Sequence, residues 1–313
     1  MINFRFHLAS LIAIFLALAL GVVVGAGVID RGVVDTLNSR LDKVERESDK
    51  IRGENNDLRD QNSSLENFIT KSQCYAVEGR LATDDVAVVA VRGVDPESVK
   101  DTTEAVKCAG GRVNGVLWLE DKWKLANDDD IKAMADALGS TARRPATLRA
   151  AAWKQLASRL RGAPGITDDS TDLLARLQSA GFVSFDNGGD DTLRLDEFPS
   201  RGAATLLAVG SNADIPDSDT VLPGATAISG ESVPLVVGDV YVSTPDGPDR
   251  GSALKAIHDN ETLAAKVSTV DDLDRPQGPT TAVIALADLL RTPPTIGQYG
   301  LTSEQPLPDI TSK

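Results

Sequence analysis

The chain has 313 residues, a length that fits one large domain or two modest ones. It carries 46 Asp and Glu residues against 32 Lys and Arg residues, and the resulting net charge of -14 opposes binding to the phosphate backbone of nucleic acids. Aromatic residues make up only 4% of the chain, which disfavours base-stacking platforms and aromatic carbohydrate clefts. Two Cys, two His and two Met residues leave few soft ligands for a metal ion.

A membrane-spanning helix is predicted over residues 8–29, after a short tail at 1–7. This stretch contains no charge, and Ser10 is its only polar residue. As a helix it is about 33 Å long, enough to cross the hydrocarbon core of a bilayer. The alternative is a signal peptide cleaved after residues 17–19, but the apolar run continues well past that point. An uncleaved anchor is therefore predicted, and the spacing of Gly21 and Gly25 favours close approach of two such helices.

The orientation of the anchor depends on two opposing arguments. Basic residues are more frequent after the span, between 31 and 46, than in the tail, and this count favours a cytoplasmic C-terminal side. Long downstream domains, however, are translocated largely regardless of charge, and a short N-terminal tail usually enters like a signal peptide. We expect a cytoplasmic N-terminus and an extracytoplasmic head.

Residues 31–72 are predicted to form a parallel, dimeric coiled coil. A heptad repeat continues in one frame from 34 to 69, with an apolar residue at every d position. The predicted interface residues are Val34, Leu37, Leu41, Val44, Ile51, Asn55, Leu58, Asn62, Leu65 and Ile69. Asn55 and Asn62 occupy a positions, where each can pair with its own copy and fix the register of a parallel dimer.

The charged residues beside this repeat agree with a parallel dimer. In such a dimer each g residue meets the e residue five positions later on the partner helix. The pairs are Arg40 with Glu45, Glu47 with Arg52, Glu54 with Arg59, and Gln61 with Glu66. No pair has like charges, which favours the dimer over a single amphipathic helix lying on its own domain or an antiparallel hairpin.

An acidic, Rossmann-like α/β domain is predicted over residues 80–300. The Val-rich run 86–91 is typical of a buried parallel strand. Asp95 and Pro96 then provide a helix N-cap and first position, and a second apolar run follows at 115–119. Strand, helix and strand in this order predict a βαβ unit.

The rest of this domain continues the alternation. Helices are predicted at 128–138, 147–161 and 170–180, strands at 204–209, 233–242 and 267–270, and a late apolar helix around 283–290. One doubly wound sheet is expected, with a division into two lobes near residue 200 as the alternative. Residues 301–313 are predicted to form a flexible tail.

Candidate chemistry is sparse. The first strand-to-helix turn contains one glycine, Gly93, where a phosphate-binding loop needs several, and two acids already occupy the positive end of the helix. The acidic clusters at 128–130, 190–191 and 271–272 lack the spacing of a calcium loop and are expected to be helix caps and solvated surface. His258 is predicted at the end of a helix over 252–258, where its imidazolium form would be stabilised. We expect no enzymatic activity, no cofactor and no metal site.

Two cysteines lie outside the membrane segment. Cys74 follows the predicted coil, and Cys108 ends the first helix of the α/β domain. In an oxidising compartment they could form a disulfide that closes a long loop, and the alternative is a pair of buried free thiols.

Both ends of the chain resemble the MctB copper transporter family of actinobacteria. The N-terminal similarity consists of Arg5, His7, Ser10, residues 15–19, Gly21 and Val22, followed by the coiled coil. The C-terminal similarity consists of residues 268–271, the apolar helix around 282–290, and the motif formed by Gly297, Tyr299 and Gly300. The similarity therefore brackets almost the full length.

This resemblance implies a role in copper efflux or copper homeostasis across the envelope. A corynebacterial branch of the family, SteB, implies instead an interaction protein that works with a SteA-like membrane partner in cell-wall separation and cell division. Copper(I) prefers sulfur ligands, and the soft ligands outside the membrane segment are scattered along the sequence. They are Cys74, Cys108, Met134 and His258. The residues themselves favour a homodimeric envelope scaffold that presents an acidic head to a protein partner, and copper is implied by the family resemblance alone.

Overall fold

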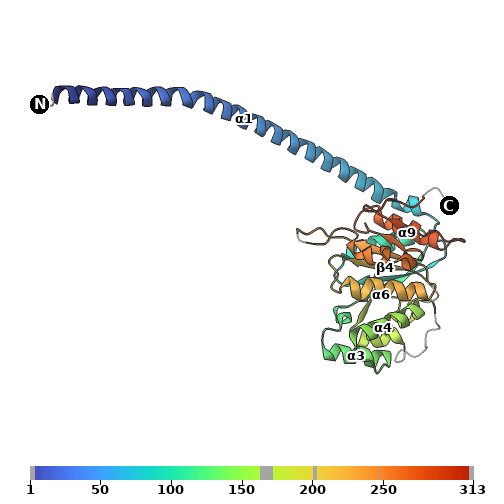
Figure 1. Ribbon diagram of the computed structural model, residues 1–313. Coiled ribbons are helices and arrows are strands. Elements are labelled where there is room, and N and C mark those ends of the chain that lie inside the picture. Colours follow the sequence, from blue (N-terminus) through green and yellow to red (C-terminus); the bar gives the residue numbers. More distant parts are fainter. Residues whose placement is uncertain (1–3, 163–171, 200–202, 246, 310–313) are drawn as a thin grey trace. The chain divides into compact units, whose positions relative to one another are not determined.

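The computed structural model describes residues 4–162, 172–199, 203–245 and 247–309, apart from the side chains of 26–34. The chain divides into two compact units, Met1–Leu65 and Glu66–Lys313. Helix α1 (Phe4–Val77) makes up the described part of the first unit and continues into the second (Figure 1). The second unit contains a seven-stranded sheet with helices, so the predicted α/β class is confirmed.

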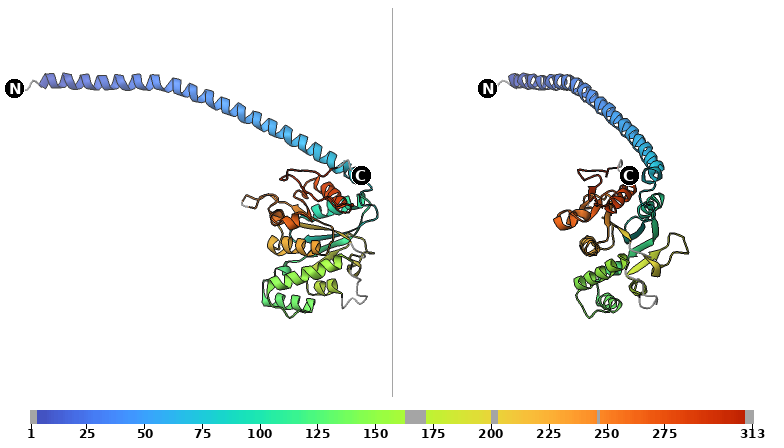
Figure 2. Two further views of the ribbon diagram at one scale, coloured as in Figure 1. Left: turned by 45° about the vertical axis from the view of Figure 1, so that its right-hand side comes forward. Right: turned by 90° about the vertical axis from the view of Figure 1, so that its right-hand side faces the viewer.

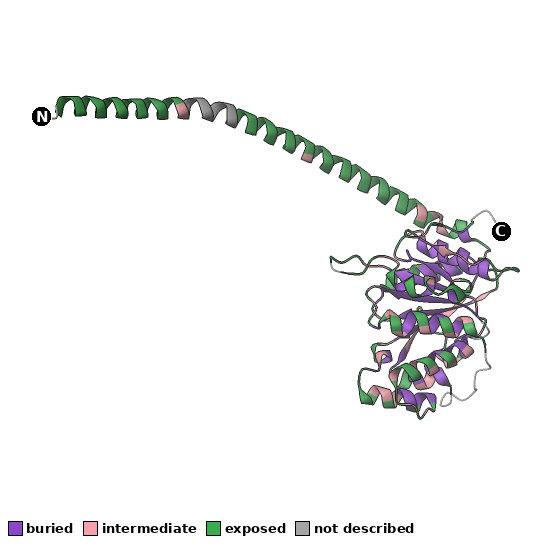
Figure 3. Cartoon of the chain, viewed as in Figure 1, coloured by how far each residue is buried: buried purple, intermediate pink, exposed green. Residues whose placement is uncertain are grey.

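Helix α1 begins with a stretch, Phe4–Gly25, that is long and apolar enough to cross a membrane. Its described side chains are exposed nearly throughout (Figure 3). The last residues of the predicted span, 26–29, lie outside the described side chains. The sequence from 31 to 77 has no proline, so nothing interrupts the backbone hydrogen bonds of the helix.

Seven strands of the described residues form one mixed sheet with the order β3-β2-β1-β4-β5-β6-β7. Their bounds are β1 (Asp85–Val91), β2 (Arg112–Leu119), β3 (Val183–Asp186), β4 (Ala204–Gly210), β5 (Leu235–Val240), β6 (Ser268–Val270) and β7 (Gln298–Tyr299). Every neighbouring pair is parallel except β2 and β3. Because β4 pairs with β1, a single sheet spans residue 200, and the alternative of two lobes is wrong.

Helices cover both faces of the sheet (Figure 2). The longer ones are α2 (Pro96–Cys108), α3 (Asp128–Leu138), α4 (Pro145–Leu160), α5 (Leu173–Ser179), α6 (Asp217–Gly230) and α9 (Gly278–Leu289). Val88 of β1 packs in the cluster formed with α2 and α9, whereas its neighbour Val89 packs in the cluster formed with α3, α4, α5 and α6. Successive side chains of a strand point to opposite faces, so a run that is apolar at every position needs a helical layer on each side.

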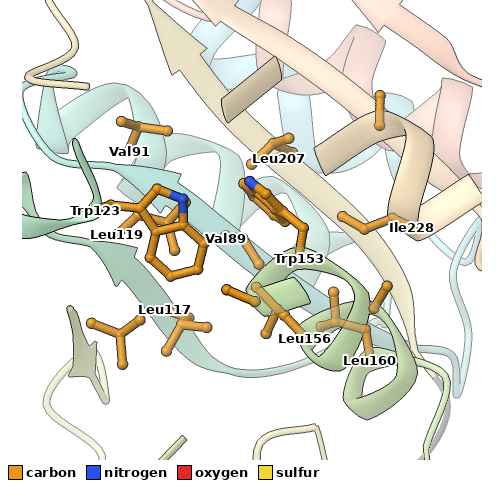
Figure 4. Close-up of a cluster of buried hydrophobic side chains, with 14 of the residues drawn as sticks. Val89, Val91, Leu117, Leu119, Trp123, Trp153, Leu156, Leu160, Leu207 and Ile228 are labelled. Atoms are coloured by element: carbon orange, nitrogen blue, oxygen red, sulfur yellow. The ribbon is translucent and has the colours of Figure 1, made fainter. Parts of the chain in front are cut away.

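Two tryptophans lie at the centre of the larger cluster (Figure 4). Trp123, in the 3-10 helix η1 (Asp121–Lys124), meets Trp153 of α4 edge to face, with ring centroids 5.5 Å apart. The indole N–H of Trp153 donates to the carbonyl of Asp219 at 3.2 Å. A Cβ atom on Gly224 of α6 would lie 3.0 Å from the Trp153 ring, so this helix approaches α4 closely only because the residue is glycine.

The last turn of α1 is attached to the α/β unit in two ways. Val77 is fully buried against the α2 and α9 side of the sheet. Cys74 is joined by a disulfide to Cys108 at the end of α2, with Cα atoms 4.9 Å apart. The two cysteines therefore form a disulfide in the structure and are not a pair of buried free thiols.

Three local features differ from the sequence analysis. Strands β3 and β7 were not predicted, because each is short and pairs along one edge only. The segment 252–258 is a 3-10 turn, η3 (Ser252–Leu254), followed by the short helix α7 (Lys255–His258). The predicted flexible tail is anchored where it begins, since the backbone N–H groups of Leu301 and Thr302 donate to the carboxylate of Asp271.

Removing the disulfide is expected to destabilise the α/β unit. In Cys74→Ser/Cys108→Ser the free energy of unfolding should fall by about 4 kcal/mol, because the crosslink closes a loop across a sequence separation of 34 residues. Tryptophan fluorescence during thermal unfolding of the full chain in detergent micelles reports on this unit, since all three tryptophans are buried there. Equal melting temperatures for the oxidised and reduced wild-type protein would contradict this expectation.

Candidate functional site

The carboxyl edge of the sheet is where a ligand-binding site is expected in this type of fold. In doubly wound sheets, ligands bind outside the carboxyl ends of the strands, at the point where the strand order reverses. Here that point lies between β1 and β4, which are followed by the loops 92–95 and 211–216.

These two loops fill the crevice themselves. The backbone N–H of Asp214 donates to the carbonyl of Arg92 at 2.6 Å. Gly93 has a φ angle of 97°, and a Cβ atom there would lie 2.4 Å from the carbonyl oxygen of Asn212. The loops are therefore in direct backbone contact where a dinucleotide would otherwise enter.

The charges at this point also oppose an anionic ligand. Asp95 caps α2 by accepting hydrogen bonds from the N–H groups of Glu97 and Ser98, and α6 carries two acids in its first turn. Arg92 forms an ion pair with Glu120 at 2.6 Å, and its guanidinium group lies 4.5 Å from the centroid of the Trp118 ring. The hydrogen bond from Arg92 lowers the pKa of Glu120. The geometry thus agrees with the sequence argument against a phosphate-binding loop, which used the single glycine and the two acids at the start of α2.

A second group of polar residues lies at the carboxyl ends of β5 and β6 and in the segments that follow them. We call it the acidic edge, and it consists of Asp239, Arg250, Asp271, Asp272 and Asp274. Asp239, Asp271 and Asp272 are each only 1% exposed. The expectation that the cluster at 271–272 is solvated surface is therefore wrong: the backbone after β6 turns back over β5, with the N–H of Leu273 donating to the carbonyl of Asp239.

Within the acidic edge, Asp274 and Arg250 clamp the two ends of a loop. Arg250 donates to both carboxylate oxygens of Asp274, at 2.6 and 2.8 Å, and its guanidinium lies 4.5 Å from the centroid of the Tyr241 ring. The N–H of Tyr241 donates to the same carboxylate at 3.2 Å. Tyr241 and Arg250 are thereby held together at the base of the loop, while residues 243–245 and 247–249 between them are exposed.

Two carboxyl groups of the acidic edge are incompletely paired. One oxygen of Asp239 accepts from the N–H of Gly251 at 3.0 Å, and one oxygen of Asp272 accepts from the side chain of Gln277 at 2.8 Å. The other oxygen of each is buried without a hydrogen-bond partner. Burial raises the pKa of Asp239 to about 7 and that of Asp272 to about 6, because a charged carboxylate loses its water there.

The soft ligands named from the sequence do not come together. Met134 is fully buried in the cluster on the α3 to α6 side of the sheet, whereas Cys108 packs against the opposite face, bonded to Cys74. His258 lines a pocket of about 500 Å³ at the β7 end of the sheet, and its Nε2 lies 2.9 Å from the hydroxyl of Thr269. Among the described residues, no three His, Cys, Asp or Glu side chains are placed to hold a metal ion.

The environment of His258 corrects one expectation. We predicted an imidazolium group stabilised by a helix terminus, but α7 has only four residues and the side chain is half-buried. Burial lowers the pKa of His258, since the charged form is the one that loses hydration. The neutral form is therefore favoured.

The predicted interface residues of α1 face solvent in this single chain. Leu37, Leu41, Val44, Ile51, Leu58 and Leu65 are between 54% and 63% exposed. Asn55, also exposed, donates to the carbonyl of Ile51, and Asn62 is exposed as well. Ile69 is half-buried, and no atom approaches within 4 Å of a Cβ built on Gly21 or Gly25. The side chain of Val34 lies outside the described residues.

The acidic edge was missed by the sequence analysis. One signal was available: Asp239 is the only charged residue in the apolar run 233–242. An acid inside a buried parallel strand is costly unless it is paired or neutral, so it marks a special position. The ion pair between Arg250 and Asp274 could not be inferred, because the two residues are far apart in the sequence.

Together these features define a class of protein: an α/β protein with a self-filled crevice and one N-terminal helix of membrane-spanning length. The sequence profile of the family described as "Copper transport outer membrane protein, MctB" matches residues 1–307. The chain therefore belongs to the MctB family, which confirms the resemblance seen in its sequence. Family and apolar helix together fit a membrane or envelope protein.

Related proteins match along the whole chain. Proteins named "Copper transporter MctB" from Mycobacterium tuberculosis and Mycobacterium bovis are 23% identical over 312 residues, covering 96% of each chain. The protein of the same name from Mycobacterium leprae is 29% identical over 314 residues, again covering 96% of each chain.

Replacing Asp239 is expected to change how stability depends on pH. The pKa of Asp239 is raised by folding, so its contribution to stability is full below about pH 4 and is lost as the pH rises through about 7. Asp239→Asn, which is neutral at every pH, should therefore be more stable than wild type at pH 8, by on the order of a few kcal/mol, and about equal at pH 4.

Thermal unfolding at pH 4, 6 and 8 measures this difference. The matched control is Asp191→Asn, the same change at an exposed residue, and it should leave the difference from wild type constant with pH. An Asp239→Asn protein that is less stable than wild type at pH 8 would show that a charged Asp239 supports the fold.

Breaking the clamp should release the loop between Tyr241 and Arg250. Asp274→Asn removes the charged partner of Arg250, and because both side chains are mostly buried, with 11% and 15% exposure, the cost should be about 3 kcal/mol. Hydrogen exchange should accelerate in this loop and remain unchanged in β1 and β4. Asp249→Asn, a change at an exposed residue of the same loop, is the control, and equal exchange in the two variants would refute the clamp.

Proposed function

We propose that this chain is a dimeric, membrane-anchored scaffold of the cell envelope that supports copper homeostasis through a protein partner, without coordinating copper and without enzymatic activity. The copper process comes from the family to which the chain belongs and from the printed name of its relatives. The scaffold role comes from the chemistry of this chain's own residues.

The separation of the soft ligands is the observation that carries this proposal. Tight binding of copper(I) generally needs two or three sulfur or imidazole ligands that converge on one ion. Here Met134 and Cys108 lie on opposite faces of the sheet, and the disulfide consumes both thiols. This arrangement supports an indirect role in copper homeostasis.

The exposed stripe along α1 supports the dimer. A single helix that leaves six large apolar side chains more than half exposed is not stable against association in water. These side chains follow the heptad frame, and the residues beside them form opposite-charge g–e pairs in a parallel pair of helices. A second copy of the chain is the partner that satisfies both features.

The disulfide supports the proposed orientation. Disulfides persist in oxidising compartments and are rare in the cytosol. The link between Cys74 and Cys108 therefore favours an extracytoplasmic α/β unit and a cytoplasmic N-terminus, against the simple count of basic residues.

A SteB-like role in cell-wall separation is the alternative. The clamped, exposed loop between Tyr241 and Arg250 favours it, because a loop held at its base and free at its tip suits contact with a protein. In this alternative the chain works with a SteA-like partner, and copper has no part.

Crosslinked purification from native envelopes separates these functions. The full chain is captured after crosslinking, with and without copper stress, and bound proteins are identified by mass spectrometry. Copper-handling proteins that depend on copper stress support the first function, and a division or cell-wall protein bound under both conditions supports the alternative. Capture by wild type but not by Asp274→Asn would assign the contact to the clamped loop.

The oxidised full-length protein is expected to hold no stoichiometric copper at sub-micromolar affinity, because its sulfur ligands are paired or buried apart. Metal content after dialysis against a calibrated copper(I) chelator, on oxidised and reduced protein, measures this. One copper per chain in the oxidised sample, lost in His258→Ala or Met134→Ala, would contradict the proposal. Binding in the reduced sample alone would assign the ligands to Cys74 and Cys108.

A cysteine introduced in the α/β unit should be reached from outside the cell. Asp191 is exposed, and both native cysteines are paired, so Asp191→Cys provides a single reactive thiol. A membrane-impermeant maleimide is expected to label it in intact cells, with the wild-type chain as the unlabelled control. Labelling only after lysis would show that the unit is cytoplasmic.

A further inference from the structure

Two aromatic side chains near the end of α1 point into solvent. Phe68 is 69% exposed and Tyr75 is 85% exposed. Every other aromatic residue of the unit Glu66–Lys313 is buried or half-buried. The two are seven residues apart, so they lie on the same side of the helix, two turns from each other.

The other side of this part of α1 is already occupied by the chain's own α/β unit. Val77 is buried in the cluster with α2 and α9, and Ile69, Gln73 and the small residue Ser72 are half-buried. Tyr75 lies two residues from both Gln73 and Val77, a rotation of about 200°, so it points away from that unit. The two aromatic side chains therefore cannot be covered from within the chain.

The heptad repeat connects this face to the predicted dimer. In the frame that begins at Val34, Phe68 and Tyr75 both occupy g positions, where the preceding heptads carry Arg40, Glu47, Glu54 and Gln61. With the d residues Leu65 and Ser72 they form a 3-4-3 spacing, which is itself the pattern of a helix seam. The hydroxyl of Ser72 donates to the carbonyl of Phe68 at 2.8 Å, so this small residue brings no unpaired polar group to the seam.

We propose that a second copy of this chain covers the aromatic stripe, which we define as Phe68, Ser72 and Tyr75, and that the seam of the coiled coil moves there from the a and d positions to the d and g positions. This inference rests on the proposed dimer. The a residue Ile69 is half-buried, whereas the g residues Phe68 and Tyr75 are exposed, so the large side chains available to a partner helix lie at the g positions here.

A second copy fits this face better than an unrelated protein. The helix is continuous from the predicted heptads into the stripe, so a parallel, in-register pair brings the two stripes together without any further docking step.

Cysteine crosslinking of the full chain in native membranes tests the shift. In a d–g seam the two copies of residue 68 face each other closely enough for a disulfide, whereas at g positions of an a–d seam the Cα atoms are beyond the roughly 7 Å limit for bridging. Phe68→Cys should therefore yield a crosslinked dimer on mild oxidation. Thr70→Cys, an exposed position on the far side of the helix, should yield none. Leu58→Cys, at a d position within the heptads, reports on the dimer itself.

A fourth variant, Ile69→Cys, reports on the a position of the unshifted seam, and the four variants together separate the possible failures. Crosslinking at Leu58→Cys and at Phe68→Cys supports both the dimer and the shifted seam. Crosslinking at Leu58→Cys and Ile69→Cys but not at Phe68→Cys overturns the shift and leaves the dimer standing. Crosslinking at none of these positions overturns both proposals, and equal crosslinking at Thr70→Cys and Phe68→Cys marks random collision and overturns the specific seam.

Sedimentation in detergent micelles provides a second measurement. Phe68→Ala with Tyr75→Ala is expected to raise the dissociation constant of the dimer at least about 100-fold, because four aromatic side chains leave the interface of each dimer. Lys71→Ala, an exposed residue between them, is the matched control and should leave the constant unchanged. An unchanged constant in the aromatic double variant would refute the role of the stripe.

Discussion

The covalent attachment of α1 to α2 is the constraint on which much of this molecule depends. Cys74 and Cys108 join the end of a membrane-proximal helix to the first helix of the sheet, and Val77 is buried beside them. The same bond favours an oxidising compartment, removes both thiols from metal chemistry, and fixes which side of α1 the α/β unit occupies. One pair of residues therefore determines both the state of the two thiols and the attachment of the last turn of α1 to the α/β unit.

The sheet has the strand order of doubly wound folds, which bind ligands where the order reverses, but its own loops fill that crevice. Its strand order places a reversal between β1 and β4, but the contact between Arg92 and Asp214 fills that position with the protein's own backbone. The buried polar side chains are instead concentrated in the acidic edge, at the carboxyl ends of β5 and β6. Buried carboxyl groups with unpaired oxygens cost stability, so their presence at the acidic edge marks it as the part of the fold least explained by stability alone.

The sequence was informative where a residue's role depends on its neighbours in the chain. The Val-rich run of β1, the Asp95 cap and the apolar helix α9 were predictable because local pattern and tertiary environment agree there. The two-residue strand β7 and the burial of Asp271 were not, since both depend on backbone segments about thirty residues away in the sequence. Acidic residues that follow a strand are expected to be exposed to solvent, unless the segment that packs over them is known.

The anchoring of residues 301 and 302 by Asp271 has a consequence for biogenesis. Strand β7 and the donors to Asp271 follow β6 by about thirty residues, so the strand they complete is made before them. During synthesis, the β6 edge therefore stays open, and the carboxylate of Asp271 lacks these donors, until residues 298–302 have been made. A nascent chain interrupted before residue 298 would expose this edge to chaperones and proteases.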